Sequence, residues 1–148
     1  MLGVQSVETT TARLMSVLKS PKDIRLILRE NATKIATPSL REHLQHLLEM
    51  KKMERQDVIR RAELDSNYIN QLFSGIRTKP GRDQTLALAF GFELDSDGAN
   101  RLLRVAGVGA LYSKNKRDAV IIHALENGKT IMQTNEVLSS MALKTLAS

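Results

Sequence analysis

Residues that cap or break helices recur at short intervals along this chain, and this punctuation limits the possible folds more than any other feature. Pro21 and Pro38 interrupt the first third, and Gly75, Gly91 and Gly107 follow later apolar stretches. Between these breaks, apolar residues repeat every three or four positions, and no stretch of useful length alternates between apolar and polar residues. The sequence therefore predicts an all-α protein of about eight short helices.

The breaks divide the chain into three predicted segments: an N-terminal helical extension (1–37), a central helical domain (38–107) and a C-terminal helical extension (108–148). In the first segment we expect a helix over Ser6–Lys19 and a second one directly after Ser20-Pro21, since proline suits a first helical turn. Their apolar stripe consists of Leu14, Val17, Leu18, Ile24, Ile27 and Leu28. This stripe and the C-terminal helices are two alternatives for an interface between copies of the chain.

Two short predicted helices, Glu54–Ala62 and Ser66–Ser74, lie close together in the central segment. Asp65 can cap the second helix, and Gly75 suits the positive φ that often ends one. Asp83 is expected to cap the helix that follows. Two helices joined this tightly predict a helix-turn-helix, whose second helix can protrude into a major groove of DNA.

The outward positions of the second helix all carry hydrogen-bonding side chains: Ser66, Asn67, Tyr68, Asn70 and Gln71. An amide side chain can donate to and accept from adenine at the same time, so this face suits the major groove. No acidic residue occurs from Ser66 to Arg82, and three cations follow the helix: Arg77, Lys79 and Arg82. We predict that these cations contact the phosphate backbone.

The run from Met53 to Pro80 resembles, without a gap, the helix-turn-helix of Cro/CI-type repressors, the XRE family. The positions that carry the resemblance are apolar Met53, Val58, Leu64, Ile69 and Leu72, small Ala62, and then Gly75 and Pro80. More loosely, residues 38–141 are similar to bacterial XRE-type regulators. The resemblance implies a lambda-repressor-like bundle with extra helices at both ends. It also implies sequence-specific binding of double-stranded DNA, as a homodimer, in transcription regulation.

The resemblance also implies roles for individual residues. Base contacts fall on Ser66, Asn67 and Gln71, with Tyr68 and Asn70 beside them. Phosphate contacts fall on Arg55, at the start of the preceding helix, and on Arg77 and Lys79.

Two positions depart from the family pattern. Glu63 stands where a glycine is usual, so a left-handed residue there costs about 1 kcal/mol, or the turn is built differently. Phe73 replaces a frequent glutamate, so we expect the familiar buried ion pair with an arginine of the first helix to be absent.

Several function classes are disfavoured by what the sequence lacks. Without cysteine there is no disulfide, thiolate nucleophile or Cys-ligated metal. The longest largely apolar stretch, Leu86–Phe92, is far shorter than the ~20 residues that span a bilayer, and Met1–Met15 lacks a signal-peptide pattern. His43 and His46 are interpreted as surface residues, not metal ligands. We therefore expect a soluble cytoplasmic protein with no membrane partner and no catalytic, cofactor-binding or metal-binding residues.

The net charge of +6 is compatible with a polyanionic partner but is weak evidence alone. One alternative function is a protein-protein interaction module that uses a helix-turn-helix scaffold without specific DNA binding. Another is a regulator with a small-molecule pocket among its C-terminal helices, although no residue pattern indicates an effector.

Overall fold

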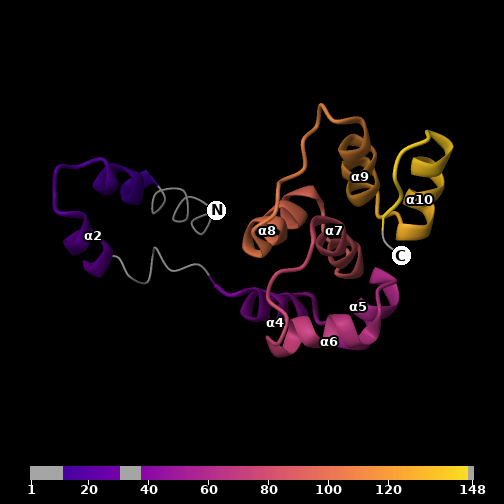
Figure 1. Cartoon of the computed structure of the whole chain (residues 1–148), viewed down its shortest axis with the longest axis horizontal. Helices are drawn as coiled ribbons and strands as arrows, with labels where there is room; N and C mark the ends of the chain where they lie inside the picture. The colour runs from indigo at the N-terminus through magenta and orange to yellow at the C-terminus, as the bar shows by residue number, and fades with distance from the viewer. Residues whose placement is uncertain (1–11, 31–37, 147–148) are drawn as a thin grey trace. The chain divides into compact units, whose positions relative to one another are not determined.

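The computed structural model describes residues 12–30 and 38–146 and separates the chain into two compact units, residues 1–37 and 38–148 (Figure 1). Within the described residues, all regular secondary structure is helical. This confirms the prediction of an all-α protein. No helix in this part of the chain is long and apolar enough to cross a membrane.

The first unit contains a helical stretch over residues 12–18 and helix α2 (Ile24–Glu30). Residue 19, the last of the predicted helix Ser6–Lys19, lies in a turn. Residues 6–11 of that predicted helix are outside the described residues. The second helix begins at Ile24, later than predicted, because the Asp23 carboxylate accepts the backbone N–H of Arg25 and so starts the helix there. Of the predicted apolar stripe, Ile27 is buried, whereas Leu18, Ile24 and Leu28 are exposed.

The second unit is built from seven helices that follow one another through short connections (Figure 1). They are α4 (Leu40–Lys51), α5 (Arg55–Ala62), α6 (Ser66–Ser74), α7 (Arg82–Gly91), α8 (Ser96–Ala106), α9 (Lys116–Glu126) and α10 (Ile131–Ser140). Side chains of Asp65, Asp95 and Thr130 accept backbone N–H groups at the starts of α6, α8 and α10, and the cap at Asp65 agrees with the prediction. These local caps explain why most helix starts could be read from the sequence.

Helix α7 forms the centre of the second unit. Its residues from Thr85 to Gly91 are all buried, and it packs against α5 on one side and α8 on another. Gly91 makes the α5 contact possible, because a Cβ there would lie 2.8 Å from the backbone oxygen of Val58. Ile121 of α9 and Leu138 of α10 belong to the same hydrophobic core. The C-terminal helices are therefore an integral part of this unit.

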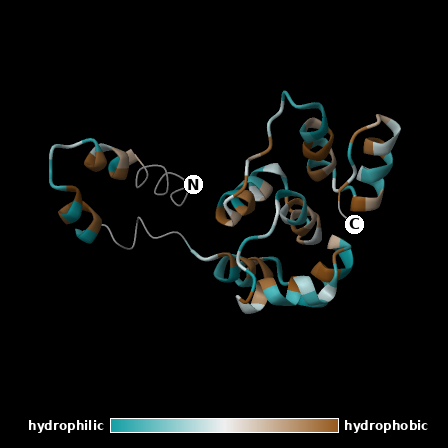
Figure 2. Cartoon of the chain, in the orientation of Figure 1, coloured by the Kyte–Doolittle hydropathy of each residue, from teal (hydrophilic) through white to brown (hydrophobic). Residues whose placement is uncertain are grey.

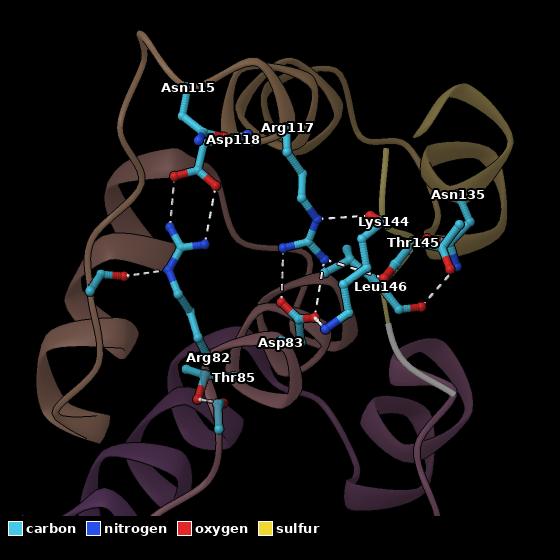
Figure 3. Close-up of polar contacts among 12 residues, drawn as sticks. Arg82, Asp83, Thr85, Asn115, Arg117, Asp118, Asn135, Lys144, Thr145 and Leu146 are labelled. Atoms are coloured by element: carbon cyan, nitrogen blue, oxygen red, sulfur yellow. Dashed lines mark hydrogen bonds and ion pairs between the residues drawn. The ribbon is translucent and has the colours of Figure 1, made fainter. Parts of the chain in front are cut away.

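The start of α7 differs from the prediction. Gly81 is the N-cap residue, and the hydroxyl of Thr85 donates to the Gly81 carbonyl at 2.8 Å. Asp83 does not cap the helix. Its carboxylate instead accepts two hydrogen bonds from Arg117 of α9, at 3.0 and 3.1 Å (Figure 3). A long-range ion pair has replaced the local role expected for this residue.

Candidate nucleic-acid interface

The turn between α5 and α6 consists of only Glu63, Leu64 and Asp65. Glu63 adopts the left-handed conformation, with φ 53° and ψ 34°, so of the two possibilities for this turn the structure has the left-handed one. Leu64 packs against the core, and the Asp65 carboxylate accepts the N–H of Tyr68 at 3.1 Å. These contacts fix the direction in which α6 leaves the turn.

Helix α6 has one buried and one outward face. Ile69, Leu72 and Phe73 are buried, and the helix packs against α4. In Figure 2, α6 carries both hydrophobic and hydrophilic positions, which correspond to these two faces. The polar positions named by the sequence are Ser66, Asn67 and Asn70, which are exposed, and Tyr68 and Gln71, which are half-buried. The structure therefore brings all five predicted base-contact residues to the accessible part of one helix.

Gln71 and Tyr68 share a partner in Arg77, three residues beyond the end of α6. The Nε of Arg77 donates to Oε1 of Gln71 at 3.1 Å, and the Arg77 backbone N–H donates to the Gln71 carbonyl at 3.1 Å. The Arg77 guanidinium lies over the Tyr68 ring, 5.0 Å from its centroid. Burial raises the pKa of the Tyr68 hydroxyl, and the charge of Arg77 opposes this shift. Arg77 therefore folds back along α6 instead of extending from the loop.

Arg55 is held in a similar way on the other flank of α6. Its Nη1 donates to Oδ1 of Asn70 at 3.2 Å, and its guanidinium lies 4.6 Å from the centroid of the Phe73 ring. Phe73 in turn lies against Phe92, with ring centroids 6.4 Å apart. Phe73, the second departure from the family pattern, thus supports a cation of the interface.

The cations beside α6 carry uncompensated charge. Arg55, Arg77 and Lys79 are exposed, and among the described residues no carboxylate lies within ion-pair distance of them. By contrast, Arg60 and Arg61 of α5 pair with Asp57 and Glu93. A negatively charged partner that binds at α6 would therefore not have to displace a carboxylate of the described residues from these three cations.

Arg82 occupies a different position from the other predicted phosphate contacts. Its guanidinium donates to both carboxylate oxygens of Asp118, at 3.1 and 2.7 Å (Figure 3). It also donates to the carbonyls of Gly109 and Ala110. Four of its five N–H donors are thereby engaged inside the unit. Arg82 therefore joins α7 to α9, and the phosphate contact predicted for it stays a prediction.

One basic residue beside α6 was not identified from the sequence. Arg41 of α4 lies against the end of α6. A Cβ added to Gly75, the residue that ends this helix, would be 3.3 Å from Arg41 Cδ. Arg41, Arg55 and Ser74 also line one hollow of about 550 Å³. Arg41 precedes α6 by 25 residues and belongs to no motif, so only the packing of α4 on α6 reveals its position.

The described residues contain no group of three or more His, Asp or Glu side chains that could hold a metal ion. The chemistry of this surface is that of hydrogen-bonding amides and hydroxyls between unpaired cations, which matches base edges flanked by phosphates. No family model, curated protein or solved structure matches this chain. The function is therefore inferred from the residues of this surface.

Proposed function

We propose that this protein is a transcriptional regulator that binds double-stranded DNA sequence-specifically by inserting α6 into the major groove. The observation that carries the proposal is the outer surface of α6. Exposed Ser66, Asn67 and Asn70 lie there between Arg55 and Arg77, whose charges no carboxylate of the described residues neutralises. On this proposal, the second unit is a lambda-repressor-like helix-turn-helix bundle of the Cro/CI (XRE) type.

The dimensions of α6 support this role. With its side chains an α-helix is about 10–12 Å in diameter, which fits a major groove about 12 Å wide. Ser66 and Asn67 lie in its first turn, the part that reaches base edges in helix-turn-helix proteins. Arg55 and Lys79 lie on either side of the helix in sequence, where the two phosphate backbones of the groove would pass.

One such helix reads only a few base pairs, so we further propose a homodimer on a site with two-fold symmetry. Two exposed apolar surfaces are candidates for its interface. The first unit exposes Met15, Leu18, Ile24, Leu26 and Leu28, and α10 exposes Met132, Val137 and Met141. Leu28→Glu and Val137→Glu, each made in the full chain, distinguish them, because only the variant at the true interface reduces the mass measured by light scattering.

Selection of bound duplexes from a random pool by the full chain tests the proposed function. The expected result is enrichment of one motif whose two halves lie one helical turn, or a multiple of it, apart. Binding to the enriched duplex should weaken steeply with added salt, because phosphate contacts release counterions. A pool with no enriched motif after repeated selection contradicts the proposal.

A protein-interaction module is the second candidate, and the exposed Met132, Val137 and Met141 of α10 favour it. On this reading α6 is an ordinary solvated helix face, and retention on duplex DNA is weak and independent of sequence. The same selection therefore separates the two candidates.

A further inference from the structure

The side chain of Arg77 is oriented for a role different from the one its sequence position indicates. A residue in the loop after a recognition helix is expected to contact phosphate. Arg77 instead turns back, and its guanidinium lies over Tyr68, a residue of the first turn of α6. This places the guanidinium beside the half of α6 that would lie deepest in the groove.

Three contacts hold the Arg77 guanidinium in this position. The Tyr68 ring supports its flat face, and Gln71 Oε1 accepts a hydrogen bond from its Nε. The backbone N–H of Arg77 also donates to the Gln71 carbonyl, which fixes the start of the side chain. A guanidinium fixed at one face and at Nε has its remaining donors on Nη1 and Nη2, at the opposite end.

The two free nitrogens match one base better than the others. Guanine presents two acceptors, N7 and O6, on its major-groove edge, and a guanidinium donates to both at once. Adenine presents one acceptor and one donor there, so it can satisfy only one of the two nitrogens. Oε1 of Gln71, which an adenine-reading amide would use as acceptor, already accepts from Arg77.

We propose that Arg77 reads a guanine in the major groove and that Gln71 is the positioning residue that orients it. This inference rests on the proposed function, since it assigns a base to the surface proposed to enter the groove. The sequence indicates a phosphate contact for Arg77 and a base contact for Gln71. In this inference Arg77 makes the base contact and Gln71 orients it. Arg55 is not assigned the same role, because its Nη1 donates to Asn70 and its terminal fork is already in use.

The test compares variants of the full chain on the duplex selected from the random pool and on its single-base variants. Wild-type protein should prefer guanine at one position of each half-site by roughly 5- to 150-fold. Arg77→Ala should lose this preference and keep the others. Arg77→Lys should weaken it, because lysine has neither the planar group that lies over Tyr68 nor the Nε that donates to Gln71. Gln71→Ala and Tyr68→Ala should reduce it at the same position, whereas Tyr68→Phe, which keeps the ring, should retain it.

Lys79→Ala is the matched control, because it removes a neighbouring exposed cation and should weaken binding to all duplexes by a similar factor. A duplex with 7-deazaguanine at the preferred position tests the contact at the level of one atom, since it lacks the N7 acceptor. It should bind wild-type protein less tightly than the guanine duplex and bind Arg77→Ala equally well.

Two results overturn the inference in distinguishable ways. If wild-type protein selects a motif but Arg77→Ala weakens all duplexes equally, Arg77 is a phosphate contact and only this inference fails. If wild-type protein shows no sequence preference, the proposed function fails and the inference fails with it.

Discussion

The arginines of the second unit serve two purposes, and their partners distinguish them. Arg82 and Arg117 each make a two-bonded contact with an aspartate, and both side chains are largely covered. Arg55 and Arg77 are exposed and lie on aromatic rings. The first kind holds helices together, and the second kind is available to a partner. Substitutions of the two kinds should therefore affect different measurements, stability in one case and binding in the other.

A substitution at Gly91 tests how closely α5 and α7 must approach each other. In Gly91→Ala, the new Cβ would lie 2.8 Å from the Val58 backbone oxygen and 3.1 Å from the Ala62 Cβ. Because backbone cannot move aside cheaply, we expect a loss of about 1–3 kcal/mol in the free energy of unfolding, measured with urea. Gly109→Ala is the control, since its Cβ would have no neighbour nearer than 3.8 Å. Equal stability of Gly91→Ala and wild type would show that the helices can separate at no cost.

His43 should make stability depend on pH. Burial, with the nearby charges of His46 and Arg101, holds the pKa of His43 below its ordinary value of 6.5. Below pH 6.5 the unfolded chain then binds more protons at this residue than the folded chain, so acid favours unfolding. We expect the free energy of unfolding to fall between pH 7.5 and pH 5.5, and to fall less in His43→Gln. The same slope in both proteins would rule out this contribution.

Single residues were predictable from the sequence where their partners are near in the chain. The capping contact of Asp65 with Tyr68 spans three residues and was expected. The ion pairs of Arg82 and Asp83 could not be predicted by local rules, because Asp118 and Arg117 lie 36 and 34 residues away. In the sequence Arg82 is a cation that follows α6, and Asp83 is an acid near the start of a helix. Neither of these local features indicates a partner on α9.

At the scale of elements, α7 and α9 are joined by two reciprocal ion pairs. Consecutive residues of α7, Arg82 and Asp83, face consecutive residues of α9, Asp118 and Arg117, with the charges reversed (Figure 3). Asp118 also accepts the backbone N–H of Tyr112 in the preceding loop. The pairs join the start of α7 to the start of α9, and they secure the loop between α8 and α9.

Asp118 is the residue on which this junction should depend most. Its side chain is 8% exposed, so Asp118→Ala leaves the Arg82 guanidinium partly buried without its partner. Breaking a buried ion pair in this way typically costs about 3–5 kcal/mol. Urea unfolding should show a loss of that size, and Arg82→Met combined with Asp118→Leu should lose less.

The control for this junction is Arg60→Ala, which removes an exposed pair with Asp57 three residues away. It should change the free energy of unfolding by about 0.5 kcal/mol or less. A similarly small effect of Asp118→Ala would contradict the role given to the α7–α9 contact.

Helix ends followed the sequence where a side chain caps them and departed where it does not. Thr130 and Gln133 form a capping box at α10, a local contact between residues three positions apart. At α7 the N-cap is Gly81, which has no side chain to signal its role, and the predicted start was therefore misplaced. The pairing of α6 with α4 could not be predicted either, because it depends on packing between helices and not on local pattern.

At the scale of the whole molecule, residues 38–148 form one compact unit, which includes the predicted C-terminal extension. Ile121, Ile131, Leu138 and Leu146 are buried in the same core as α4–α8. The boundary predicted after Gly107 coincides with the end of α8, where Gly107 is the C-cap residue. Helices α9 and α10 thus belong to the same packed unit as α6.

The central claim is that the outer face of α6 reads DNA sequence, and Asn67 is the residue best placed to test it. Asn67 is exposed in the first turn of α6, so its substitution should leave folding intact. Asn127→Ala is a matched control, because it removes an exposed amide at the end of α9.

The most direct measurement is the affinity of full-length Asn67→Ala for the selected duplex and for a scrambled duplex of the same length, by fluorescence anisotropy at one salt concentration. We expect a loss of about 1–3 kcal/mol on the selected duplex, almost no change on the scrambled one, and no effect of Asn127→Ala on either. Equal affinities of Asn67→Ala and wild-type protein for the selected duplex, or an equal loss on both duplexes, would contradict the central claim.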